Sequence, residues 1–311
     1  LKWNLMDLVK KKFKKYYSQT LIHFLNNQKI TNLMNEMKFA FSSNAYRNYS
    51  IEECIDSIHL AGYDAIEIMC DIPHAFPPIS DEKINSITNC LKKNSMSISN
   101  LNGFMMTAIE DFHHPSWIEE SQNYRQKRIE HTKNCLKLAH RLGAETVSTE
   151  PGGPKTNQTT EKELELFQQG LLEVLPLAEE LQICLLVEPE PDLLIESSTQ
   201  FLNFIKKFDS KYIGLNFDIG HFFCVNEDPA KLIHEMQDYV HHIHLEDIDS
   251  SRKHRHLIPG HGSIDFQKIF NSLNSINFDG FITVELYPYQ DDPQQAAMES
   301  LTFLNSICEH V

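Results

Sequence analysis

The feature that most constrains this fold is a series of short apolar runs, each ending in a residue that can bind metal. LLVE ends at Glu188, GLNFD at Asp218, HHIH at His244 and ITVE at Glu285. Segments of helical periodicity separate the runs, so the expected strands are parallel and joined through helices. A parallel barrel carries its chemistry at the carboxyl ends of its strands. The four side chains therefore meet only if the sheet closes on itself.

The same alternation of strand and helix runs through the chain from Met37 to its end. The pattern predicts strands over 38–43, 63–69, 95–102, 145–150, 182–188, 212–218, 240–247 and 280–286. It predicts helices over 50–62, 81–94, 121–142, 159–180, 198–207, 228–237, 265–277 and 293–310. Ser50 followed by Glu53 is a capping-box signature at the first of these helices. Eight such units predict an α/β fold of the (β/α)8 TIM-barrel type over 37–311.

Residues 1–36 differ from the rest and are expected to form a basic helical extension, separate from the barrel. They hold seven Lys and two acidic residues, and apolar residues recur at helical spacing beside KKKFKK (10–15). A solvated amphipathic helix is the plainer interpretation, and a helix on a membrane surface is the alternative. MKFAF at Met37 resembles a natural start, so we expect the barrel to fold without this segment.

The net charge limits which partners the protein is expected to bind, and the cysteine content indicates its cellular compartment. The net charge is −15, and residues 1–36 contribute +5, so the remainder carries −20. This balance disfavours nucleic acid and an anionic membrane as partners. Seven Cys without a CxxC motif are typical of reduced thiols in a cytoplasmic protein. No apolar run approaches the roughly 18 residues of a membrane span.

Three carboxylates and one imidazole suit a single divalent cation of the Mn²⁺, Mg²⁺, Co²⁺ or Zn²⁺ type. Taken singly, a strand-end acid is more often solvated, and a strand histidine is more often a satisfied core residue. Unpaired carboxylates at the ends of buried strands are costly, and a shared cation removes that cost. Four such residues on four successive strands favour a metal site.

The barrel segment resembles the xylose-isomerase-like superfamily, which includes isomerases and epimerases of sugars or sugar phosphates such as D-tagatose 3-epimerase. The resemblance rests on LLVEPEP, NFDIGHFF, HIHLED, PGHGSIDF and TVELYP, in that order along 185–288. It implies a (β/α)8 fold with one divalent metal held by Glu188, Asp218, His244 and Glu285. Glu188 and Glu285 would also be the catalytic acid/base pair, and His221 would contact the substrate.

The chemistry implied is proton transfer beside a carbonyl group. A cation stabilises the enediolate that forms, and two carboxylates on opposite faces of it remove and return the proton. The substrate would be a small sugar or sugar phosphate. The resemblance is also compatible with a homo-oligomer. An inosose-dehydratase-like lyase using the same residues is the alternative. An endonuclease IV-like metal-dependent phosphodiester hydrolase comes third, because a strongly acidic barrel repels DNA.

Other polar residues near the strand ends are candidates for substrate binding. Asp247 lies three residues after His244, where it either orients that ligand, binds substrate or caps a turn. Glu67 and Glu150 stand at the ends of the second and fourth predicted strands, where they can line the mouth of the barrel or be solvated.

The segment His254-Arg255-His256 departs from the pattern of simple epimerases. Endonuclease IV barrels carry two extra ligands, as Asp-x-His, at the similar place. His221, His254 and His256 therefore suggest a second metal site. The alternative, which the pattern of the resembling family favours, is that these histidines and Arg255 bind substrate hydroxyls or phosphate.

Overall fold

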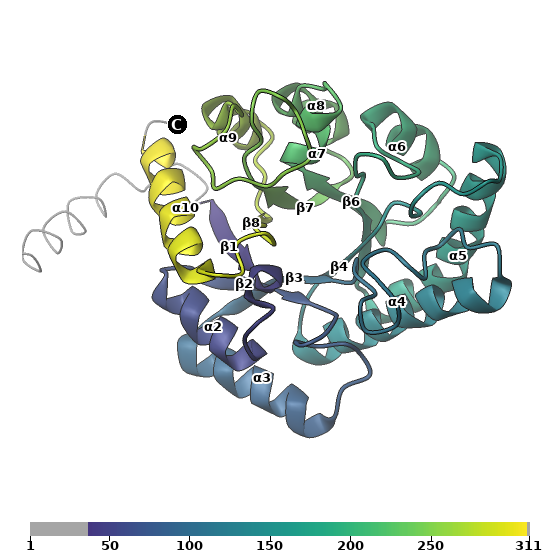
Figure 1. Cartoon of the computed structure of the whole chain (residues 1–311), viewed down its shortest axis with the longest axis horizontal. Coiled ribbons are helices and arrows are strands. Elements are labelled where there is room, and N and C mark those ends of the chain that lie inside the picture. The colour runs from purple at the N-terminus through teal and green to yellow at the C-terminus, as the bar shows by residue number, and fades with distance from the viewer. Residues whose placement is uncertain (1–36, 310–311) are drawn as a thin grey trace, which may run out of the picture. The chain divides into compact units, whose positions relative to one another are not determined.

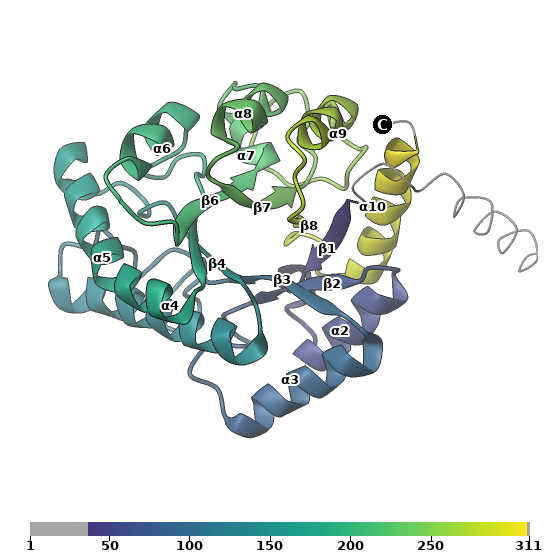
Figure 2. The same cartoon turned by 180° about the vertical axis from the view of Figure 1, so that it is seen from behind.

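Eight parallel strands form a closed barrel with helices around its outside in the computed structural model, which describes residues 37–309 (Figures 1 and 2). The strands pair in sequence order, and β1 closes the ring by pairing with both β2 and β8. The predicted (β/α)8 fold is confirmed. The predicted basic extension, residues 1–36, lies outside the described residues.

The element bounds agree with the predicted alternation to within two residues. The strands are β1 Lys38–Ser42, β2 Ala65–Met69, β3 Ser97–Asn102, β4 Thr146–Thr149, β5 Cys184–Val187, β6 Ile213–Asp218, β7 Val240–Leu245 and β8 Phe281–Val284. The helices are the 3-10 helix η1 Ser43–Tyr46, and α2 Ile51–Leu60, α3 Asp81–Asn94, α4 Gln122–Leu142, α5 Thr160–Leu181, α6 Ser198–Ile205, α7 Ile219–Cys224, α8 Pro229–Met236, α9 Phe266–Ser275 and α10 Pro293–Cys308.

Capping residues mark where helices begin, and the spacing of apolar residues determines which helix face packs against the barrel. At α2, Ser50 accepts the backbone N–H of Glu53 and the Glu53 side chain accepts the Ser50 N–H, which is the predicted capping box. In α9, four apolar residues at helical spacing are buried, namely Phe266, Ile269, Phe270 and Leu273. Burial of one such side chain contributes about 2 kcal/mol.

Two short helices, η1 and α7, were not predicted, and α7 matters for the site. No element was predicted between the strand over 212–218 and the helix over 228–237, but Asp218 ends β6 and caps a helix there. Its Oδ1 atom accepts the backbone N–H of His221 at 2.7 Å. The turn that follows places His221 over the end of the barrel, beside the strand end that carries Asp218.

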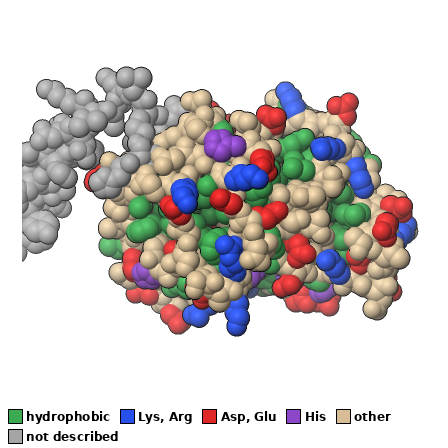
Figure 3. All heavy atoms as spheres, turned by 90° about the horizontal axis from the view of Figure 1, so that it is seen from above, with side chains coloured by type: hydrophobic (Ala, Val, Ile, Leu, Met, Phe, Trp, Pro, Cys, Tyr) green, Lys and Arg blue, Asp and Glu red, His purple; other side chains and the backbone are tan. Residues whose placement is uncertain are grey.

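The surface of the barrel unit is mixed in charge. On the face seen in Figure 3, Lys and Arg side chains are interspersed with Asp and Glu. Within residues 37–309, no helix is long and apolar enough to cross a membrane. All seven cysteines are free thiols, three of them only partly buried.

Candidate metal centre and pocket

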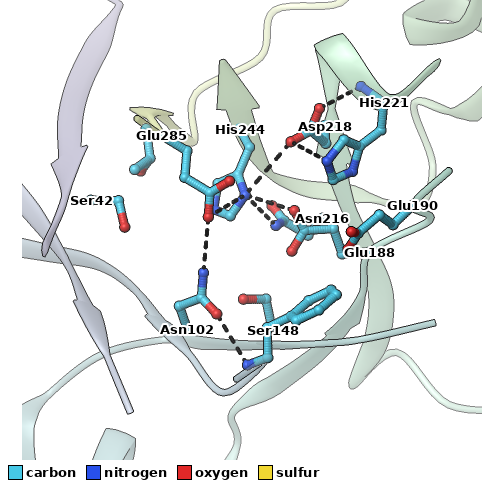
Figure 4. Close-up of polar contacts among 12 residues, drawn as sticks. Ser42, Asn102, Ser148, Glu188, Glu190, Asn216, Asp218, His221, His244 and Glu285 are labelled. Carbon is cyan, nitrogen blue, oxygen red and sulfur yellow. Dashed lines mark hydrogen bonds and ion pairs between the residues drawn. The ribbon is translucent and has the colours of Figure 1, made fainter. Parts of the chain in front are cut away.

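Four side chains converge at the carboxyl ends of β5 to β8 (Figure 4). Glu188 follows β5, Asp218 ends β6, His244 lies near the end of β7 and Glu285 follows β8. One ligand-type atom from each lies within 4.8 Å of the corresponding atoms of the other three, and all four residues are buried. The structure thus brings together the four residues that the strand-end pattern singled out.

The donor set of this cluster fits a divalent cation. His244 Nδ1 lies 2.8 Å from Glu188 Oε1, 3.8 Å from Glu285 Oε1 and 4.0 Å from Asp218 Oδ2. Glu188 Oε2 and Asp218 Oδ2 are buried without a hydrogen-bond partner. Burial raises the pKa of Glu188, with repulsion from Asp218 adding to it, and raises that of Glu285 well above its usual value. A cation among these atoms would satisfy the unpaired oxygens and hold the carboxylates ionised.

Glu67 does not line the pocket but supports His244 from β2. Its Oε2 atom lies 2.7 Å from His244 Nε2, and Ser42, Asn100 and Asn102 donate to the same carboxylate. Burial would raise the pKa of Glu67, but His244 outweighs it and lowers that pKa to about 2. An ionised Glu67 keeps the proton of His244 on Nε2, which leaves the Nδ1 lone pair for a metal. The structure therefore places Glu67, predicted to bind substrate, behind His244 and outside the cavity lining.

Three histidines form a second cluster beside the first. His221 Nε2 and His256 Nε2 each lie 3.0 Å from His254 Nε2. Burial lowers the pKa of His221 and His256, the latter to about 3, so both imidazoles are neutral. Their Nδ1 atoms face the backbone carbonyls of Pro189 and Glu285 and must donate to them. The Nε2 lone pairs of His221 and His256 then both face Nε2 of His254. That atom carries at most one proton, so it can donate a hydrogen bond to only one of them.

The two clusters open into one cavity of about 300 Å³. Its polar wall includes Glu188, Glu285 and Glu190, and none of the thirteen described residues that line it is Lys or Arg. Burial raises the pKa of Glu190 well above its usual value, with Glu188 adding to the effect. The remaining lining residues are Asn44, Asn102, Phe104, Met105, Phe112, His113, His221, His254, His256 and Tyr287.

Two further predicted substrate-binding residues lie elsewhere. Arg255 is exposed and does not line the cavity. The Asp247 carboxylate is buried and accepts four backbone N–H groups, two of them from Gly260 and Gly262 at 2.9 and 2.8 Å. A Cβ atom at Gly262 would lie 2.3 Å from Asp247 Oδ1, so only glycine fits this close approach. Asp247 anchors the loop that follows the histidine cluster, as the turn-cap alternative anticipated.

Glu150 is fully buried behind the loop that follows β3 and does not line the cavity. Its Oε1 atom accepts the backbone N–H of Trp117 at 3.3 Å and lies 3.6 Å from Arg128 Nε. The structure therefore places Glu150, predicted to bind substrate, against this loop and outside the cavity lining.

Comparison with known proteins places this geometry in a family. The sequence profile of the xylose isomerase-like TIM barrel family matches residues 55–307. The chain belongs to this family. An inosose dehydratase of Geobacillus thermodenitrificans is 24% identical over 294 residues, covering 83% of this chain and 90% of that protein. The fold matches a D-tagatose 3-epimerase-like protein (TM-score 0.76, 24% identity, 88% and 98% of the two chains) and the zinc-bound IOLI protein (0.73, 16%, 87% and 98%).

Several pocket residues escaped sequence reasoning. Asn44, on η1, donates to Glu285 Oε1 at 2.8 Å, yet SSNAY after a strand looks like an ordinary turn. Glu190 and Pro191 repeat the Glu-Pro pair of Glu188 and Pro189, and this repeat could have marked Glu190 as a second candidate in the same segment. Phe112, His113 and Tyr287 come from loops, where no periodicity marks a side chain that faces a cavity.

Proposed function

We propose that this protein is a divalent-metal-dependent isomerase or epimerase of sugars. The observation that carries the proposal is that Glu188 and Glu285 belong to the ligand cluster and also line the cavity. Family membership supports an enzyme, since relatives such as the dehydratase are enzymes. The zinc-bound IOLI protein supports metal dependence, and Mn²⁺, Mg²⁺, Co²⁺ and Zn²⁺ all suit the donor set.

The two carboxylates are suited to move a proton on and off a carbon beside a carbonyl. When bound, a cation supplies a Lewis acid for the carbonyl oxygen and the adjacent hydroxyl. Glu188 offers one oxygen to the ligand cluster, so its other oxygen is available to take the proton. Glu285 is held on its Oε1 side by Asn44 and Asn102, which fixes the direction of its other oxygen. Return of the proton by the second carboxylate inverts the carbon centre, and return to the neighbouring carbon isomerises the sugar.

The cavity favours an uncharged sugar over a sugar phosphate. Phosphate sites commonly use Arg or Lys as partners, and the described lining offers neither. Arg255, which the sequence suggested for this task, is exposed and outside the lining. Acidic residues in the wall would also repel a nucleic-acid backbone, which argues against the phosphodiester hydrolase.

Exchange of a substrate hydrogen with solvent tests the proposal. Metal-loaded protein is incubated in D₂O with a panel of ketoses and aldoses, and deuterium at the carbon beside the carbonyl is read by NMR. Glu188→Gln and Glu285→Gln should each lower exchange by roughly 10²–10⁴-fold. Glu190→Gln, which alters a pocket carboxylate outside the ligand cluster, is the matched control and should keep most of the exchange. Full activity in both ligand variants would refute the mechanism.

A dehydratase is the second candidate, because a relative that matches most of this chain's length is an inosose dehydratase. Removal of the same proton followed by loss of a neighbouring hydroxyl would convert the isomerase reaction into elimination of water. Mass spectrometry of the product separates the two, since an isomer keeps the mass of the substrate and a dehydrated product loses one water.

The histidine cluster is suited to a second cation. Two neutral imidazoles with fixed tautomers and a third imidazole at 3.0 Å from both match the ligands of Zn²⁺ sites. If the cluster is metal-free, His221 and His256 instead accept hydrogen bonds from substrate hydroxyls. A count of bound metal decides between the two roles.

A further inference from the structure

The loop between β3 and α4 brings a histidine to the cavity wall with a carboxylate behind it. His113 lines the cavity, and its Nδ1 atom is buried without a hydrogen-bond partner. Glu150, after β4, is fully buried, and its Oε2 atom also has no partner. These two unpaired atoms lie 4.0 Å apart. Buried polar atoms are almost always paired, so two that face each other call for an explanation.

The surroundings turn the free oxygen of Glu150 toward His113. Its other oxygen, Oε1, is occupied by the Trp117 N–H and lies beside Arg128. Arg128 also donates to the carbonyl of His113 at 3.2 Å, so one guanidinium fixes both members of the pair. Such an arrangement, in which a third group orients a carboxylate–imidazole pair, is typical of proton-transfer sites.

We propose that His113, backed by Glu150, is a further proton-transfer residue of the pocket and acts on a substrate oxygen. The inference rests on the proposed function, since it concerns the oxygen whose charge changes while Glu188 or Glu285 removes the proton from carbon. Neither His113 nor Glu150 belongs to the four-residue cluster or to the histidine cluster.

The proton balance of the step is simple. As the carbon loses its proton, the C–H electron pair forms the new C=C bond and the carbonyl π pair moves to oxygen. That oxygen takes the proton from His113 Nε2, and His113 Nδ1 takes the proton from Glu150 Oε2. His113 ends neutral with its tautomer switched, and Glu150 ends as a carboxylate. The reverse transfers restore the pair when carbon regains its proton.

The protonation states of the pair suit this relay. Burial raises the pKa of Glu150 to about 7 against the opposing charge of Arg128, so near neutral pH it is present in both forms. Burial lowers the pKa of His113 to about 4, so the imidazole is neutral. Other groups that act on the pair are Asp111, His114 and Glu119 from the same loop and His254 across the cavity. Rotation of the ring or one bridging water closes the 4.0 Å gap.

Paired substitutions test the relay by activity. His113→Gln should lower turnover by roughly 10²-fold with little change in KM, and Glu150→Gln should lower it by a similar factor. Because the two act as a unit, the double variant should be no slower than His113→Gln alone. The dependence of kcat on a group with a pKa near 7 should vanish in each variant. Independent, multiplicative losses, or an unchanged pH profile, would overturn the proposal. His140→Gln, which changes an exposed histidine on α4, is the control.

A spectroscopic test separates failure of the relay from failure of the proposed function. In ¹⁵N-labelled metal-loaded protein, the His113 ring signals, assigned by their loss in His113→Gln, should show a neutral Nε2–H tautomer between the pKa of His113, about 4, and that of Glu150, about 7. They should shift as Glu150 titrates, and Glu150→Gln should abolish that shift. A ring that does not sense Glu150 overturns the pair, whatever the activity. A coupled pair in a protein that exchanges no sugar hydrogen refutes the sugar isomerase instead.

Discussion

Replacement of Arg128 should destabilise the protein strongly, because this side chain is fully buried and donates four hydrogen bonds. It donates from Nε to the carbonyl of Pro115 at 2.9 Å, from one terminal nitrogen to Gly103 and Phe104 at 3.1 and 2.7 Å, and from the other to His113. It is also the partner of the Glu150 carboxylate. Arg128→Met keeps an unbranched side chain of smaller volume but leaves four carbonyls without their donor and removes the ion-pair partner of Glu150.

The expected loss in the free energy of unfolding is about 4 kcal/mol. A hydrogen bond to a charged group contributes about 1.5–3 kcal/mol, but the four bonds do not add, because the freed loop can turn its carbonyls to water. Removal of one partner of a buried ion pair costs about 3–5 kcal/mol, and the expected loss for Arg128→Met lies within this range. Arg128→Lys keeps the charge but not the planar fork of donors, so we expect about half that loss.

Urea unfolding followed by circular dichroism measures this loss through the midpoint and the slope. Arg141→Met is the matched control on the same helix, since Arg141 is exposed and forms an ion pair with exposed Asp81. Its effect should stay within about 0.5 kcal/mol. If Arg128→Met lies within about 1 kcal/mol of the wild type, the loop does not depend on this residue and the reasoning fails.

Further outcomes concern the metal sites and pH. Asp218→Ala should lose the tightly bound cation, as read by elemental analysis, and equal metal content in variant and wild type would contradict the site. His256→Ala should lower the metal count from two to one if the second site is real, and an unchanged count of one assigns the cluster to substrate. Bound metal should be released as pH falls, because protons compete for Glu188 and Glu285, whose pKa values burial raises. The pKa of Glu150 rises from 4.5 to about 7 on folding. Glu150 therefore stabilises the folded protein by about 3 kcal/mol at pH values below 4.5, and this contribution is lost as pH rises through 7. The stability advantage of wild type over Glu150→Gln should therefore shrink across this range in urea titrations, and a constant difference would contradict the assignment.

The strand ends were predictable because two simple regularities agree there. Apolar runs of strand length place Glu188, Asp218, His244 and Glu285 at equivalent positions, and parallel pairing brings equivalent positions together. The barrel bounds followed from the same alternation, with Ser50 marking the start of α2.

The positions of the two supporting carboxylates were not predictable in this way. Glu67 lies within β2 and Glu150 directly follows β4, so both resemble the ligands in sequence, but Glu67 contacts the back of His244 and Glu150 contacts Arg128. Nothing in their spacing separates a carboxylate that faces the cavity from one that supports its wall. The exposure of Arg255 was not predictable for a related reason. In an irregular segment the spacing of residues does not indicate which of His254, Arg255 and His256 faces the cavity.

The crowding of Glu188, Asp218 and Glu285 has a consequence for the life of the protein in a cell. A cation that binds the folded chain and not the unfolded chain stabilises it in proportion to the logarithm of its free concentration. Newly made copies that meet no cation keep buried carboxylates in mutual repulsion and so open more often to proteases. The steady-state amount of this protein should therefore follow the metal supply of its host, falling under chelation even when synthesis is constant.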